Sequence, residues 1–225
     1  MSTYFTVKKK CAVCGKENEI KICSSTHAFG YCDLDFRPAE QMRSILYLQV
    51  EECESCGFVS MNIENDKYAN IYKKLSNNEY YKYCGGIKFD NDVAEKFYKI
   101  YLLNANLNNE TASFFALRNA SWICDDVGDE KNAITCRIKA LKFLDILISN
   151  KDNNLEKYIL IKMDFMRRCK MFEEVIKCYK DFNFTDESHY KVYKYQKFLA
   201  KIGDSQISNY GEVINFQNLK ITNAF

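Results

Sequence analysis

The stretch "KKCAVCGKENE", residues 9–19, contains two cysteines with two residues between them and a glycine directly after the second. The same pattern returns in "EECESCGFVS", residues 51–60. A CxxCG segment is typical of a zinc knuckle, in which a tight turn aims both sulfurs at one ion and the glycine supplies the turn conformation. Two such segments predict one shared site with four thiolate ligands: Cys11, Cys14, Cys53 and Cys56.

The predicted site is closed. Four thiolates complete a tetrahedral shell around Zn²⁺ and leave no position for water, so we expect a structural zinc ion without a catalytic role. Iron held by the same four cysteines is an alternative, because thiolate ligation does not separate the two metals. A redox disulfide within each CxxC is a second alternative, although two matching segments favour one shared ion.

Composition limits the compartment and the class of partner. The chain has 225 residues, 47% of them hydrophobic and 15% aromatic, which is ample for a core. A net charge of +2 predicts no strong attraction to nucleic acid or to a membrane surface. Eleven cysteines cannot all pair internally, and "MSTYFTVKKK" (1–10) lacks the apolar stretch of a signal peptide, so we expect a cytoplasmic protein.

The pattern of apolar residues changes along the chain. Alternating runs predict strands in "YFTVKK" (4–9), "EIKICSS" (19–25) and "ILYLQVEE" (45–52). From residue 88 onward the spacing is helical. The fold class is therefore a small β zinc ribbon followed by an all-α array of helical hairpins. The predicted domains are a split zinc ribbon with an insert at 1–62, a connector at 63–87 and a helical domain at 88–225.

Helices are predicted wherever apolar residues recur at helical spacing between breakers. The predicted ranges are 92–107, 111–125, 130–149, 155–169, 172–182 and 187–203, with one short helix at 67–75 in the connector. The tail, 204–225, is polar with scattered apolar residues and only weakly suggests an element.

Two helical segments align at an offset of 42 residues. "GDEKNAITCRIKAL" (128–141) matches "KMFEEVIKCYKDF" (170–182), with Ala133 over Val175 and Ala140 over Phe182. Small residues at such places let two helices approach closely, as in tetratricopeptide repeats. Lys170, Val175 and Phe182 depart from the Gly and Ala that these repeats favour. We therefore expect helical hairpins and leave a regular superhelix as an open alternative.

The segment between the knuckles, "CSSTHAFGYCDLDFRPAEQMRS" (23–44), collects several reactive side chains: His27, Cys32, Asp33, Asp35 and Arg37. A nucleophile pair or a cation site is one interpretation. We favour the other, in which the two aspartates fix turns, Arg37 pairs with one of them, and Pro38 starts a short helix, "AEQMRS". His27 has no second histidine nearby, so no catalytic residue is predicted.

Other cysteines and aromatic residues at helical spacing are expected in the core. They are Cys84, Cys124, Cys136, Cys169, Cys178, Phe114, Phe115, Trp122 and Tyr158. An aromatic groove for a ligand is the alternative.

Several motifs together resemble an uncharacterised bacterial family, a domain of unknown function that joins a split zinc ribbon to tetratricopeptide-like helices. The similar segments are "SSTHAFGYCDLDFRP", "NASWICDD" (119–126) and "RRCKMFEEV" (167–175), beside the two CxxCG pairs. The resemblance implies that Cys11, Cys14, Cys53 and Cys56 are metal ligands. His27 and Cys32 stand where the family has other residues, and no activity comes with the resemblance.

The sequence therefore favours a non-enzymatic, zinc-binding interaction or scaffold protein whose helices bind a protein or peptide. Nucleic-acid binding through the ribbon is the alternative, weakened because residues 1–60 hold seven basic and eight acidic side chains. An enzyme is least favoured, since the chain has two histidines and neither a phosphate-binding glycine loop nor a nucleophile elbow.

Overall fold

The structure is a computed structural model that describes residues 2–151 and 153–222. The chain forms two compact units. The first contains the chain up to His27 together with Gln41–Phe143, and the second contains Ala28–Glu40 and the chain from Leu144 onward. The boundaries predicted at residues 62 and 87 stay predictions, because compactness does not tell whether a fragment folds alone.

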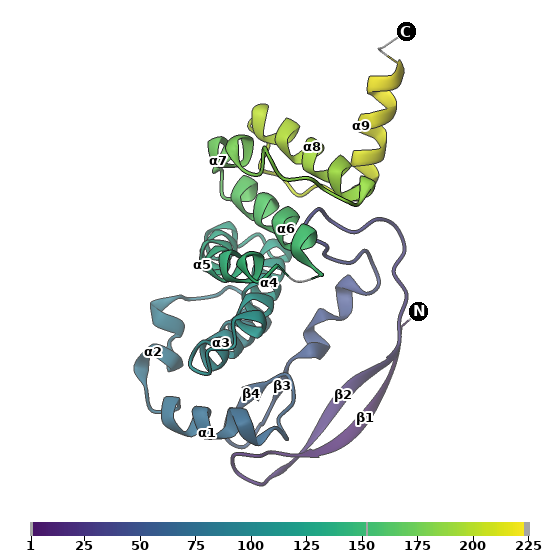
Figure 1. The fold of residues 1–225 in the computed structure, drawn as a ribbon. Helices are drawn as coiled ribbons and strands as arrows, with labels where there is room; N and C mark the ends of the chain where they lie inside the picture. The colour runs from purple at the N-terminus through teal and green to yellow at the C-terminus, as the bar shows by residue number, and fades with distance from the viewer. Residues whose placement is uncertain (1, 152, 223–225) are drawn as a thin grey trace. The chain divides into compact units, whose positions relative to one another are not determined.

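Two β-hairpins carry the cysteine pairs of the first unit (Figure 1). β1 (Thr3–Lys10) pairs antiparallel with β2 (Glu17–Ser25), which confirms the two strands predicted from alternation. β3 (Glu51–Glu52) pairs with β4 (Val59–Ser60). Each CxxCG segment therefore occupies the turn between two paired strands.

The strand predicted at 45–52 is wrong. Most of this segment is a 3₁₀-helix, η1 (Arg43–Gln49), and only Glu51 and Glu52 belong to a strand. Within η1 the buried residue is Leu46, while Tyr47 next to it is exposed. Short apolar runs fit a strand and a tight helix equally well, and periodicity alone does not separate them.

The short helix predicted at 39–44 is also absent, since η1 begins only at Arg43. The backbone before it is used in another way. The Phe29 N–H donates to the Glu40 carbonyl at 2.5 Å, and the Met42 N–H donates to the His27 carbonyl at 3.1 Å. These groups hold the segment in an extended pairing, so they are unavailable for helical hydrogen bonds.

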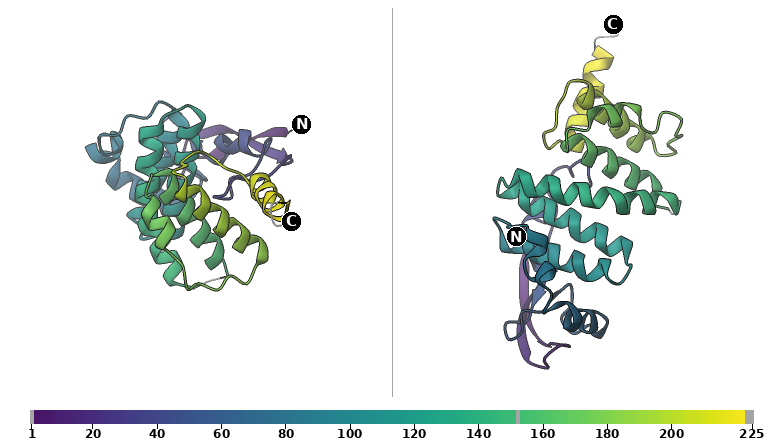
Figure 2. Two further views of the ribbon diagram at one scale, coloured as in Figure 1. Left: turned by 90° about the horizontal axis from the view of Figure 1, so that it is seen from above. Right: turned by 90° about the vertical axis from the view of Figure 1, so that its left-hand side faces the viewer.

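The helices of the first unit begin after asparagines whose side chains accept backbone N–H groups: Asn65, Asn78, Asn91 and Asn109. The elements are α1 (Asp66–Leu75), α2 (Glu79–Lys82), the 3₁₀-helix η2 (Cys84–Gly86), α3 (Asp92–Ala105), α4 (Glu110–Asp126) and the beginning of α5 (Glu130–Ser149). α3 and α4 lie side by side as a hairpin (Figure 2). Phe97, Leu103, Phe114 and Leu117 are fully buried in this pair.

The second unit contains α6 (Leu155–Arg168), α7 (Phe172–Lys177), α8 (Glu187–Lys201) and α9 (Tyr210–Thr222). The helix predicted at 172–182 is too long, because the backbone turns extended at Cys178 and Tyr179 has a φ of 53°. The other predicted helices are confirmed to within two residues. Residues 223–225 of the predicted tail lie outside the described residues. In the described part of the chain, no helix combines the length and the apolar character that crossing a bilayer needs.

The insert between the knuckles packs within the second unit. Asp33 forms a β-bridge with Asn209. The Leu34 N–H donates to the Ser208 carbonyl at 3.0 Å, and the Tyr210 N–H donates to the Cys32 carbonyl at 2.9 Å. The insert is thus held by the segment between α8 and α9, more than 160 residues away in sequence.

One turn geometry recurs at several helix ends. Gly128 after α4 and Lys170 after α6 have φ values of 75° and 62°. In both turns the next N–H reaches back five residues to a helix carbonyl, from Asp129 to Cys124 and from Met171 to Met166, at 2.9 Å each. The 42-residue offset therefore holds through the turn, but it fails further on because α7 ends before Phe182.

Candidate metal centre

The four cysteines of the two CxxCG segments lie together in the first unit. All four sulfurs are within 4.8 Å of one another. Sγ of Cys11 is 3.8 Å from Sγ of Cys56, and Sγ of Cys14 is 3.6 Å from Sγ of Cys53. Zinc–sulfur bonds of about 2.3 Å in a tetrahedron place sulfurs about 3.8 Å apart, so the spacing suits a metal such as zinc.

The two knuckles have the same backbone geometry. In the first, the Cys11 N–H donates to the Lys16 carbonyl at 2.9 Å and the Gly15 N–H donates to the Cys11 carbonyl at 2.8 Å. In the second, the Cys53 N–H donates to the Phe58 carbonyl at 2.9 Å and the Gly57 N–H donates to the Cys53 carbonyl at 2.8 Å. The doubled sequence motif is therefore a doubled structure.

The glycines permit this turn. Gly15 and Gly57 have φ values of 73° and 69°, which lie in the left-handed region that side chains disfavour. The turn also places the Val13 N–H 3.4 Å from the Cys11 sulfur. Backbone N–H groups directed at sulfur favour the thiolate over the thiol.

Two polar side chains join the knuckles, and sequence reasoning missed both. Asn18 donates to the Lys16 carbonyl at 3.0 Å and accepts the Glu54 N–H at 3.1 Å. Glu51 accepts from Lys9 at 2.5 Å and from the Ile63 N–H at 3.0 Å. Both Asn18 and Glu51 are buried. These contacts hold the cysteine pairs at a fixed separation, as second-layer partners of metal sites do.

Tyr72 of α1 fixes the second knuckle from the helical side. Its hydroxyl donates to the Cys56 carbonyl at 2.7 Å, and its ring lies 5.0 Å from the ring of Phe58, centroid to centroid. Burial raises the pKa of the Tyr72 hydroxyl, so it stays a donor at neutral pH. The metal centre is thus fixed by α1 as well as by its own hairpins.

The four thiols differ in acidity. Burial raises the pKa of Cys11 and of Cys56, and hydrogen bonds with the neighbouring thiols raise that of Cys56 further. Burial also raises the pKa of Cys53, but hydrogen bonds from the backbone N–H groups of Cys56 and Ser55 and from neighbouring thiols outweigh it, giving about 7. Binding of a metal must displace the remaining protons.

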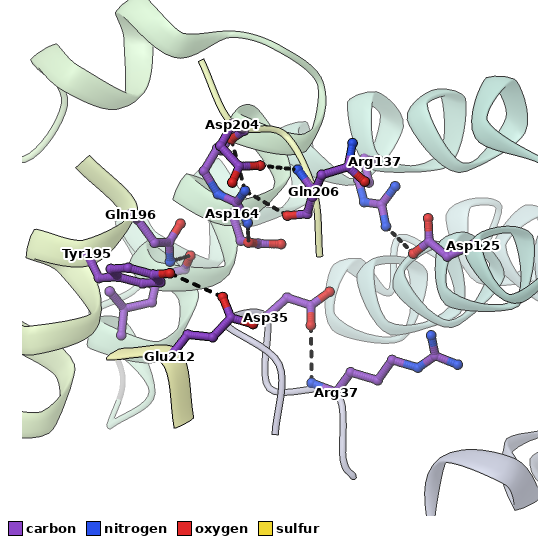
Figure 3. Close-up of polar contacts among 12 residues, drawn as sticks. Asp35, Arg37, Asp125, Arg137, Asp164, Tyr195, Gln196, Asp204, Gln206 and Glu212 are labelled. Carbon is purple, nitrogen blue, oxygen red and sulfur yellow. Dashed lines mark hydrogen bonds and ion pairs between the residues drawn. The ribbon is translucent and has the colours of Figure 1, made fainter. Parts of the chain in front are cut away.

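The reactive residues of the insert have structural partners. Asp35 is buried, and its Oδ1 accepts the Arg37 N–H at 3.2 Å (Figure 3), as the turn interpretation predicts. The Asp33 N–H donates to the Arg37 carbonyl at 2.9 Å, and Phe36 adopts a φ of 63° in the same turn. Among the described residues, the four knuckle cysteines are the only group of three or more Cys, His, Asp and Glu side chains arranged to share an ion.

The remaining cysteines are free thiols. Cys84, Cys124 and Cys136 are buried as predicted, whereas Cys169 and Cys178 are half-buried. Of the aromatic residues predicted in the core, Phe114, Trp122 and Tyr158 are buried. Phe115 is not, since 36% of it is exposed, and the Arg118 guanidinium lies 4.6 Å from its ring centroid. The helical period places Phe115 one step outside the buried stripe of α4.

The architecture is a small N-terminal β region with a Cys₄ cluster, followed by a mostly helical part with packed helix pairs. Compared with models of protein families, with curated proteins and with solved structures, the chain gives no match.

Proposed function

We propose that this chain is a non-enzymatic scaffold protein in which Cys11, Cys14, Cys53 and Cys56 hold one structural zinc ion and the helices bind a protein or peptide partner. The observation that carries the proposal is the closed set of four sulfurs within 4.8 Å. Such a set leaves no position for water or substrate on the ion, so the metal can stabilise a fold but cannot activate a nucleophile.

The finer fold proposal is a split zinc ribbon joined to tetratricopeptide-like hairpins, as in the uncharacterised bacterial family that the sequence resembles. Two features support it. The knuckles sit in paired hairpins with matching hydrogen bonds, and the turns at Gly128 and Lys170 repeat at the offset of 42 residues. Eleven free thiols fit the proposed reducing, cytoplasmic compartment.

A protein partner is favoured over nucleic acid by the charges of the β region. Within the basic run before the first knuckle, Lys8 pairs with Glu17 at 2.8 Å and Lys9 pairs with Glu51 at 2.5 Å. Paired lysines contribute little to phosphate binding. In the second unit, by contrast, α8 exposes 37% of Phe198 and 59% of Ile202, which suits a protein contact.

Zinc binding is tested by metal analysis of the purified full chain. We expect one zinc per chain, lost when Cys11→Ser is combined with Cys53→Ser. The matched control combines Cys169→Ser with Cys178→Ser, two half-buried thiols outside the cluster, and should keep the metal. Full zinc retention in the first double variant would show that these cysteines are not the ligands.

The choice between protein and nucleic acid is tested by fluorescence anisotropy with labelled single- and double-stranded DNA and RNA at two salt concentrations. We expect no binding at physiological salt. Tight binding that weakens steeply with salt, as release of several counterions requires, would overturn the proposal in favour of a nucleic-acid-binding ribbon.

A further inference from the structure

One face of α8 in the second unit is lined by basic residues. Lys194, Lys197 and Lys201, with Tyr190 before them, follow each other at steps of four, three and four residues. At 100° per residue these steps keep all four on one side of the helix. Lys194, Lys201 and Tyr190 are exposed, and Lys197 is half-buried. We call Lys194, Lys197 and Lys201 the lysine face.

The lysine face carries uncompensated charge. In the part of the chain that the structure describes, no carboxylate pairs with any of its three ammonium groups, whereas Lys191 on the same helix pairs with Glu187 at 2.7 Å. The acidic residues nearest in sequence are not turned to it. Asp204, beyond the helix end, accepts the Gln206 N–H at 2.7 Å. A second segment adds charge: Lys180 is exposed beside Tyr179, whose carbonyl accepts the Tyr193 hydroxyl of α8 at 3.1 Å.

Aromatic rings hold two of these lysines in place. The Lys194 ammonium lies 4.3 Å from the centroid of the Tyr190 ring, and the Lys197 ammonium lies 4.5 Å from that of Tyr193. The two tyrosine rings stack at 6.1 Å. A lysine resting on an aromatic face has fewer conformations to lose when it binds an anion. The lysines also cover ring faces that a nucleic-acid base would need for stacking.

Apolar residues border the lysine face. Phe198 and Ile202, both exposed, follow Lys194 and Lys201 on the neighbouring side of α8. Figure 1 shows α8 and α7 adjacent in this unit, as their contacts also indicate. An apolar patch with a charged rim is the usual composition of a protein interface.

We propose that the lysine face binds an acidic segment of a partner protein, with an apolar side chain of that segment against Phe198 and Ile202. The inference rests on the proposed function and names the chemistry of the partner. Lys194 and Lys201 are seven residues apart, which is about 10 Å along a helix. An extended peptide spans that length in about three residues, so two carboxylates at this spacing would contact both lysines.

The test is fluorescence anisotropy with the full chain and three labelled probes: a ten-residue peptide alternating Glu with Leu, the same peptide with Lys in place of Glu, and a twenty-nucleotide oligothymidine. The first variant combines Lys194→Glu with Lys197→Glu. The matched control combines Lys73→Glu with Lys74→Glu, two exposed lysines of α1 in the first unit. A second variant, Lys201→Glu, changes a lysine for which no ring contact or ion pair with another described residue is recorded, and circular dichroism checks that all variants are folded.

We expect the acidic peptide to bind the unaltered chain, at least tenfold more weakly in the Lys194/Lys197 variant, several-fold more weakly in Lys201→Glu, and unchanged in the control. Equal weakening in the control variant, or no binding of the acidic peptide, would overturn the inference. Tighter binding of oligothymidine that depends on the lysine face would overturn it in favour of nucleic acid. Zinc content and capture of a partner by another surface would survive these failures, so the proposed function is tested separately.

Discussion

At the scale of single residues, the glycine after each second cysteine has a specific role. A Cβ on Gly57 would lie 3.8 Å from the Tyr72 hydroxyl, and one on Gly15 would lie 3.7 Å from the Lys10 side chain. These are ordinary contacts, so space does not exclude a side chain. What selects glycine is the positive φ of the turn, which is a property of the backbone alone.

Replacing Gly57 by Ala should therefore weaken the metal centre without disturbing its packing. We expect a loss of about 1–2 kcal/mol in zinc-linked stability, the cost of a left-handed backbone for a residue with a Cβ. Competition for zinc with a chelator of known affinity measures it. Gly86→Ala is the matched control, since Gly86 also has a positive φ of 84° with open space around it but belongs to neither knuckle. Equal zinc affinity in both variants would contradict the prediction.

The sequence alone identified the four cysteines because their spacing is local and repeated. It could not identify Asn18 and Glu51, because each acts on residues far along the chain. Glu51 contacts Lys9, 42 residues earlier, and Asn18 contacts Glu54, 36 residues later. Both are common polar residues next to a knuckle, and no pattern in one sequence pairs them with those partners.

At the scale of elements, the helix ends explain which predictions were right. Four helices of the first unit follow an asparagine cap, and their apolar residues recur at helical spacing, so both signals are local. The failures involve contacts that are not local. The segment 39–44 is extended because its backbone pairs with residues near His27, and α7 ends early where Tyr179 turns to accept a hydrogen bond from Tyr193.

The equivalent turns at Gly128 and Lys170 make opposite predictions for substitution. Lys170→Gly should raise the free energy of unfolding by up to about 1 kcal/mol, because it removes the strain of a positive φ. Gly128→Ala should lower it by about 1 kcal/mol, because a Cβ there meets no atom within 4 Å and only backbone strain is added. Urea unfolding of both variants measures the change. Shifts of the same sign would mean that the two turns are not equivalent.

The insert should be sensitive to the start of α9. A Cβ on Gly211 would come within 2.5 Å of the Tyr31 ring, which is too close to exist without movement. We expect Gly211→Ala to cost about 1–3 kcal/mol and to cost clearly less when Tyr31→Ala is also present. Thermal unfolding of the two single variants and the double variant gives the coupling. Additive costs would show that Tyr31 does not pack on Gly211.

The loop before α8 should respond to acid through Glu156. Burial raises the pKa of this carboxyl, but hydrogen bonds from the Thr185 N–H, His189 and the Thr185 hydroxyl outweigh it and leave the pKa below its ordinary value. A lowered pKa contributes stability that is present above the unfolded value, about 4.3, and is lost as the pH falls through the folded value.

Glu156→Gln should therefore cost about 1–2 kcal/mol at pH 7 and lose less further stability than the unaltered chain between pH 5 and 3. Urea unfolding at a series of pH values measures both. Glu187→Gln is the control, because Glu187 is exposed and forms only a surface pair with Lys191. Parallel pH curves for the Glu156 variant and the unaltered chain would contradict the assignment.

At the scale of the whole molecule, metal removal should act locally. The cysteine cluster joins two small hairpins, whereas the pair α3 and α4 and the helices of the second unit bury their own apolar residues. With a strong chelator, we expect the helical circular-dichroism signal of the full chain to stay nearly unchanged, while the amide hydrogens of Cys53 and Gly57 lose protection from exchange. Collapse of the helical signal would mean that the metal supports the entire fold.

The division of the chain has a consequence for its synthesis. Residues 28–40 belong to the second unit, yet their partners begin only at Leu144, about a hundred residues later. At ribosomal rates of about 5–20 residues per second, the insert waits roughly 5–20 seconds before the helices that cover it exist. During that interval Cys53 and Cys56 emerge and can close the knuckles with Cys11 and Cys14. The nascent chain thus becomes a loop tied at its base before the rest of its fold is made, and Leu34 and Asp35, buried in the finished protein, are open to chaperones until translation ends.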